Sequence, residues 1–122
     1  MMVIFEKLSK RQQAYVEVCK RFGITIGDDS YSGGEDAGLY FAVLIDENVE
    51  CAPEREVMRY CVVTVHGDHY YAFPDCDTLR EAKRAAIANA SDDLYYELPE
   101  EIINLDTGKR YMAAITAKWV EA

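Results

Sequence analysis

The stretch Arg59–Phe73, RYCVVTVHGDHYYAF, decides the fold. It holds two runs rich in β-branched and aromatic residues, separated by Gly67-Asp68. Such runs favour strands, and a Gly-first pair between them is typical of a two-residue type II′ hairpin turn. The stretch therefore predicts an antiparallel hairpin with strands at Arg59–Val65 and Tyr70–Phe73, which Pro74 ends.

Helices are predicted before and after this hairpin. Residues 5–22 repeat one face at steps of three and four, and Gly23 supplies a left-handed C-terminal residue. Residues 77–90 begin with a capping box, in which Thr78 is followed by Glu81 three positions later. The predicted face of the first helix consists of Phe5, Leu8, Gln12, Tyr15, Cys19 and Phe22.

Three further segments complete the expected fold. Leu39–Asp46 is strongly apolar and predicts a strand. Glu47–Glu56 is polar and contains Pro53, which predicts a loop or a short helical turn. Glu101–Leu105 and Lys109–Trp119 predict a final hairpin with Gly108 at the position that needs a positive φ. The sequence thus predicts one α+β domain over residues 1–122, with a mainly antiparallel sheet of about five strands and both helices packed on one face.

Charge and cysteine spacing exclude several classes of protein. There are 22 acids and 13 bases, a net charge of −9, whereas binding to a phosphate backbone needs clustered bases. No apolar run approaches the roughly 18 residues of a membrane span, and no secretion signal precedes the first charges. The four cysteines form no C-x-x-C pair, which argues against a zinc knuckle. Without a secretion signal, we expect reduced thiols and a cytoplasmic protein.

The acidic surplus is concentrated in residues 24–58, which hold nine acids and one base. One interpretation is that these acids lie in solvated loops and keep the protein soluble. The other is an acidic surface that binds a basic groove on another protein. An EF-hand does not fit Gly23–Tyr40, because neither possible register places a glutamate at the last ligand position. The candidate partner contacts are Asp28, Asp29, Tyr31, Glu35, Asp36, Tyr40, Asp46, Glu47 and Glu50.

The sequence contains one candidate metal site and no catalytic signature. In the predicted hairpin His66 and His69 become strand partners, so that two imidazoles could share a metal ion. Cys76 stands before the second helix, whose N-terminus can lower a thiol pKa. No nucleotide-binding glycine loop or serine elbow occurs. We therefore expect no catalysis and no cofactor.

The leading hypothesis is a small acidic protein that acts non-enzymatically by binding another protein. In size and charge, and in no motif, it is similar to accessory and inhibitor proteins of phages and mobile elements, which suggests an inhibitor that occupies a basic nucleic-acid-binding site. The alternative is a small metal-binding, ligand-binding or self-assembling module, built on the His66/His69 hairpin or on a pocket lined by some of the nine tyrosines.

Overall fold

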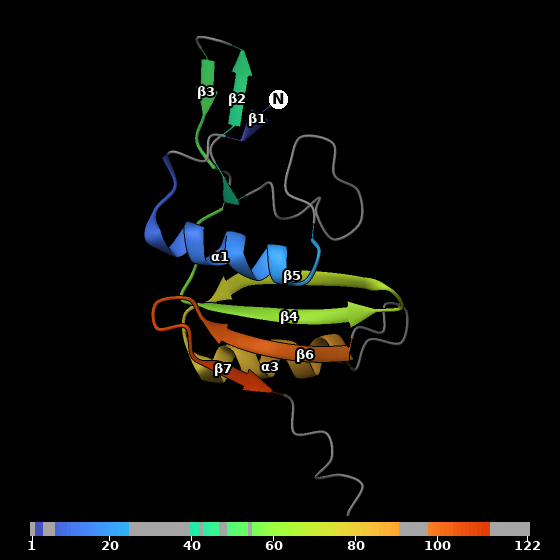
Figure 1. Ribbon diagram of the computed structural model, residues 1–122. Coiled ribbons are helices and arrows are strands. Elements are labelled where there is room, and N and C mark those ends of the chain that lie inside the picture. Colours follow the sequence, from blue (N-terminus) through green and yellow to red (C-terminus); the bar gives the residue numbers. More distant parts are fainter. Residues whose placement is uncertain are drawn as a thin grey trace, which may run out of the picture.

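The computed structural model describes residues 2–3, 7–24, 40–41, 43–46, 49–53, 55–90 and 98–112 (Figure 1). Two helices and two antiparallel sheets are found among these residues. The elements are β1 (Met2–Val3), α1 (Lys10–Arg21), β2 (Val43–Asp46), β3 (Val49–Cys51), β4 (Tyr60–His66), β5 (His69–Cys76), α3 (Leu79–Ala90), β6 (Leu98–Asn104) and β7 (Arg110–Met112).

The larger sheet has four strands in the order β5-β4-β6-β7, and every neighbouring pair is antiparallel. The predicted α+β class is confirmed, with four strands in this sheet rather than about five. Both predicted hairpins form: His66 pairs with His69 around Gly67, and β6 turns into β7 through Gly108. Gly67 and Gly108 have φ of 59° and 79°, which only glycine adopts readily.

The two helices cover opposite faces of the sheet, so the prediction that both pack on one face is wrong (Figure 1). Successive residues of a strand point to opposite sides. Cys61 and Val63 therefore pack with α1, while Val62 packs with Ala82 and Ala86 of α3. In β6 the neighbours Ile103 and Ile102 divide between the two faces in the same way.

Helix α1 has a defined cap at each end. Ser9 and Gln12 form a capping box, which starts the helix at Lys10 rather than near Phe5 as expected. At the other end Gly23 has φ of 69°, and its N–H donates to the Lys20 carbonyl while the Ile24 N–H donates to the Cys19 carbonyl. This pair of bonds is a Schellman motif, which confirms the predicted role of Gly23.

Pro74 does not end the second strand of the hairpin, contrary to the prediction. The register between β4 and β5 shifts between Tyr60 and Val62, so β5 has an extra residue opposite these positions and continues to Cys76. A proline is tolerated there because β5 is an edge strand, where an N–H is not required by a second neighbour.

The predicted strand Leu39–Asp46 is shorter and belongs to the smaller sheet. Only residues 43–46 are a strand, and they lie between β1 and β3. The segment 49–51 forms β3, so the prediction of a loop or a short helical turn over Glu47–Glu56 is also wrong. Tyr40 and Phe41 are fully buried against Tyr15 of α1.

Helix α3 begins as the capping box predicts, because the Glu81 N–H donates to the Thr78 hydroxyl at 3.1 Å. Neither α1 nor α3, the helices of the described ranges, is long and apolar enough to cross a membrane.

Candidate functional site

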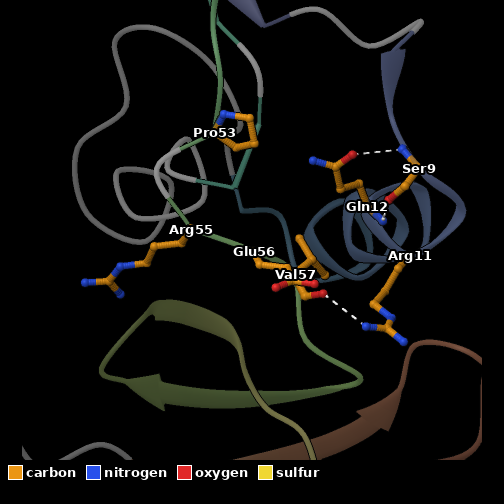
Figure 2. A pocket seen from close by; sticks show the side chains of 7 residues that line it. All are labelled: Ser9, Arg11, Gln12, Pro53, Arg55, Glu56 and Val57. Atoms are coloured by element: carbon orange, nitrogen blue, oxygen red, sulfur yellow. Dashed lines mark hydrogen bonds between the residues drawn. The ribbon is translucent and has the colours of Figure 1, made fainter.

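The N-terminal end of α1 and the segment before β4 enclose a cavity of about 430 Å³ (Figure 2). Two of its lining side chains are tied to the backbone around it. The Gln12 amide donates to the Tyr40 carbonyl at 2.7 Å, and the Arg11 guanidinium donates to the Val57 carbonyl at 3.4 Å. The lining combines polar and charged side chains with apolar ones: Ser9, Arg11, Gln12, Pro53, Arg55, Glu56 and Val57.

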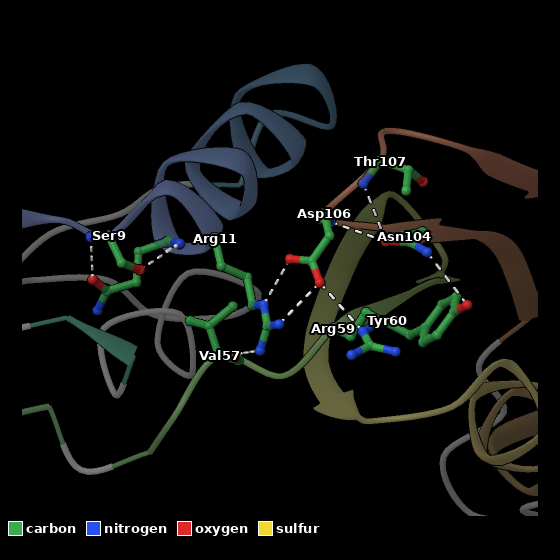
Figure 3. A network of polar contacts seen from close by, with 9 residues as sticks. Ser9, Arg11, Val57, Arg59, Tyr60, Asn104, Asp106 and Thr107 are labelled. Atoms are coloured by element: carbon green, nitrogen blue, oxygen red, sulfur yellow. Dashed lines mark hydrogen bonds and ion pairs between the residues drawn. The ribbon is translucent and has the colours of Figure 1, made fainter.

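Arg11 also joins this cavity to the β6–β7 turn (Figure 3). Its Nε and Nη2 atoms donate to the two carboxylate oxygens of Asp106, each at 2.9 Å, and Arg59 approaches the same carboxylate at 3.2 Å. The hydrogen bonds from Arg11 lower the pKa of Asp106 and raise the pKa of Arg11. The cluster formed by Arg11, Arg59 and Asp106 holds α1 against the sheet.

The depressed pKa of Asp106 makes a testable contribution to acid stability. A carboxyl whose pKa is lower in the folded state stabilises the fold above its unfolded pKa of about 3.9, and this contribution is lost as pH falls through the folded pKa. Urea unfolding at pH 6 and pH 3 should show that Asp106→Asn loses less stability on acidification than the unmodified protein. Because Asp106 is 38% exposed, we expect a difference below about 1 kcal/mol. An equal acid loss in both proteins would contradict this assignment, and Asp68→Asn, in the exposed β4–β5 turn, is the control.

Tyr40, a predicted partner contact, is instead part of the core. Its side chain is 0% exposed, and its hydroxyl donates to the carboxylate of Asp75, which lies 3.9 Å from Arg55. Burial and then the bond to Asp75 raise the pKa of this phenol. A side chain so enclosed cannot contact a partner on the surface of the folded protein, so Tyr40 leaves the set of contacts. The cause is its packing against Tyr15, with ring centroids 5.3 Å apart.

A second charged cluster lies where α1 crosses β6. The Glu101 side chain is only 2% exposed, and Arg21 donates to both of its carboxylate oxygens, at 2.9 Å for the Nη1–Oε1 pair. Arg110 approaches the same carboxylate at 3.5 Å. Arg21 and Arg110 also line a groove of about 620 Å³ beside Lys20, with Val18 and Ile103 among its apolar walls. The sequence did not identify Glu101 because a glutamate within a strand gives no sign of burial.

Most of the other predicted contacts lie outside the described residues. Asp46 and Glu50 lie on the adjacent strands β2 and β3 of the smaller sheet. The positions outside the described ranges are Asp28, Asp29, Tyr31, Glu35, Asp36 and Glu47.

Charge divides unevenly between the described residues and the rest of the chain. The described residues carry twelve bases and eleven acids, a net of +1. The remaining residues carry one base and eleven acids, a net of −10. Among the described acids, Asp75, Glu101 and Asp106 each lie within ion-pair distance of arginine. The described residues are therefore nearly neutral, and the acidic surplus belongs to the remaining residues of the sequence.

The predicted pairing of His66 with His69 is confirmed by the register of the hairpin, and both residues are exposed at its tip. Within the described ranges, no group of three or more His, Cys, Asp or Glu residues gathers to hold a metal ion. Neither of the two cavities above is lined by a tyrosine. The hairpin therefore supplies two imidazoles, and whether they take up a metal stays a prediction.

The described thiols are free and buried at Cys19, Cys61 and Cys76. Burial raises the pKa of Cys19 to about 12 and raises that of Cys61 as well. Burial also raises the pKa of Cys76, so the helix N-terminus does not activate this thiol as considered from the sequence. These cysteines act as small apolar core residues.

Comparison with protein-family models, with curated proteins and with solved structures returned no match.

Proposed function

We propose that the protein acts without catalysis, by binding a basic surface of another protein through the acids of residues 24–58. The partner is a protein that binds nucleic acid in a basic groove. The acids of residues 24–58 compete with the nucleic acid for that groove, so that the protein acts as an inhibitor. The proposed contacts are Asp28, Asp29, Tyr31, Glu35, Asp36, Asp46, Glu47 and Glu50.

The division of charge is the observation that supports this proposal. Acids that pair with arginines within the fold have their charge neutralised and contribute little to attracting a partner. The fold uses Asp75, Glu101 and Asp106 in this way, and the described residues as a whole are close to neutral. Residues 25–39 alone carry four acids and no base. Most of the negative charge of the chain therefore belongs to acids that have no role in the described ion pairs, and these acids are the ones proposed to bind the basic partner.

The test is capture of partners from a lysate of the source cell by the tagged protein. A variant with Asp28→Asn, Asp29→Asn, Glu35→Gln and Asp36→Asn should reduce capture of the principal partner about tenfold or more, because each exposed charge pair contributes roughly 0.2–1 kcal/mol. Capture should also fall steeply as salt is raised, and excess duplex oligonucleotide should displace the partner.

A matched control removes the same amount of charge from the described part of the chain. Its substitutions are Glu17→Gln, Asp68→Asn, Asp77→Asn and Glu100→Gln, none of which breaks an ion pair with the described residues. An equal loss of capture in both variants would mean that capture depends on the total charge and not on the acids of residues 24–58, which would contradict the proposal. A partner that stays bound in the presence of excess oligonucleotide would contradict competition for a nucleic-acid site.

A further inference from the structure

The outer side of α3 carries three cations that pair with nothing in the described ranges. Arg80, Lys83 and Arg84 are exposed, and none makes an ion pair with a described acid. Ile87, one turn further along, is 66% exposed. We call these four residues the α3 basic face. Helix α3 itself lies on the opposite side of the sheet from α1 (Figure 1).

The other arginines of the chain differ from Arg80 and Arg84, because each of them has an ion-pair partner among the described residues. All five of them lie within ion-pair distance of a carboxylate: Arg11 and Arg59 near Asp106, Arg21 and Arg110 near Glu101, and Arg55 near Asp75. In a chain with a net charge of −9, acids are available to pair with arginine. Arg80 and Arg84 are therefore the two of the seven arginines for which the described residues supply no ion-pair partner.

The requirements of the helix do not explain these cations. Positions 80, 83, 84 and 87 lie on one side of a helix, where Arg80 and Arg84 repel each other as a like-charged i,i+4 pair. Arg80, Lys83 and Arg84 also occupy the N-terminal half, although the helix dipole favours cations at the C-terminal end, and the last turn of α3 has no base. The single acid of the helix, Glu81, accepts a hydrogen bond from the Asp77 N–H at 3.3 Å as part of the cap.

We propose that the α3 basic face docks an acidic peptide segment of another protein, with carboxylates at Arg80, Lys83 and Arg84 and an apolar residue against Ile87. Exposed cations that gather on one side of a helix and have no ion-pair partner among the described residues offer a positive surface to an acidic ligand. Guanidinium groups bind carboxylates through two parallel hydrogen bonds, and they do so in this chain where Arg11 binds Asp106 and Arg21 binds Glu101.

Two observations favour an acidic peptide over nucleic acid. Ile87 stands within the cationic face, and an apolar side chain gains from a peptide residue rather than from a phosphate backbone. The face is also short, since seven residues of helix rise about 10 Å. That length suits two or three carboxylates, whereas a longer polyanion would be repelled more strongly by a chain with a net charge of −9.

This surface is separate from the acids of the proposed function, and it has the opposite charge. Substitution of the acids of residues 24–58 would leave the residues of the α3 basic face unchanged. Substitution of the α3 basic face would likewise leave those acids unchanged. The two proposals can therefore fail independently.

The test uses the full chain, labelled with ¹⁵N, and a capped helical peptide of about 16 residues that carries glutamates on one face and one leucine. Amide shifts and fluorescence anisotropy follow the titration. We expect saturable binding, with the largest shifts in residues 80–88, and a dissociation constant that rises about tenfold or more in the Arg80→Gln/Lys83→Gln/Arg84→Gln variant. Ile87→Ser should weaken binding severalfold with no change in its salt dependence.

The matched control, Lys10→Gln/Lys20→Gln/Lys109→Gln, removes the same charge from other exposed positions and should change the dissociation constant less than about twofold. The three-residue variant of α3 should stay folded in circular dichroism, because it removes like-charge repulsion. Absence of saturable binding, an equal loss in the control, or tighter binding of a single-stranded oligonucleotide of similar charge would overturn the proposal. So would shifts explained by self-association of the chain in sedimentation.

Discussion

Arg21→Met is expected to lower the free energy of unfolding by about 3 kcal/mol, because it removes the principal counter-charge of a buried carboxylate. Glu101 is 2% exposed and receives two hydrogen bonds from Arg21. Arg110 remains at 3.5 Å and compensates in part, which places the expected loss at the lower end of the range for breaking a buried pair. Urea unfolding at pH 7 measures the difference.

Two companion variants show whether the buried charge is the cause. Arg21→Met/Glu101→Leu should recover most of the loss, because an apolar side chain at 101 needs no counter-charge. Arg80→Met removes an exposed arginine without an ion pair to a described residue and should change stability by less than about 0.5 kcal/mol. If Arg21→Met were as mild as Arg80→Met, the Arg21–Glu101 pair would contribute nothing to the fold.

The hairpins and caps were predictable because their signals are local. Gly67 and Gly108 occupy turn positions that demand a positive φ, and Thr78 with Glu81 forms a cap within one helical turn. The same kind of signal marks Ser9 with Gln12, which sequence reasoning missed by extending the apolar face back to Phe5. Element type therefore follows from neighbouring residues, although the ends of elements follow less reliably.

The layer arrangement depends on contacts across the fold and was predicted incorrectly. A signal was present, since Cys61-Val62-Val63 and Ile102-Ile103 are consecutive apolar residues, and such runs indicate strands covered on both faces. The two hairpins predict an antiparallel sheet, and such a sheet commonly has one face exposed to solvent. The prediction that both helices pack on one face followed from this general rule. Consecutive apolar residues were the better guide.

The charged clusters needed the structure for a different reason. Arg11 is 95 residues from Asp106, and Arg21 is 80 residues from Glu101. Nothing in the sequence says which of 22 acids meets which base. These ion pairs identify the acids and bases that stabilise the fold. The cations of α3 have no ion-pair partner among the described residues, and they can therefore be considered separately from those that stabilise the fold.

Tyr15→Ala is expected to destabilise the protein by about 3–5 kcal/mol, the usual range for removing a buried aromatic ring. Tyr15 is 0% exposed at the centre of the α1 side of the core. Its ring lies edge-on to Tyr40, with centroids 5.3 Å apart, and is stacked on Phe41 at 5.8 Å. Its hydroxyl donates to the Ala72 carbonyl of β5 at 2.8 Å, so one side chain joins three segments.

Tyr15→Phe separates packing from hydrogen bonding in the same urea experiment. It keeps the ring and leaves the Ala72 carbonyl without its donor, which should reduce stability by about 1–2 kcal/mol. Tyr71→Ala, at a half-buried position on the edge strand β5, should lose less than Tyr15→Ala, because less apolar surface is removed from the core. If Tyr15→Phe lost as much as Tyr15→Ala, the hydrogen bond from the hydroxyl to β5, rather than the ring, would account for the stabilising effect of Tyr15. We expect the ring to dominate, because it alone contacts Tyr40 and Phe41, the described residues that follow the acidic segment 25–39.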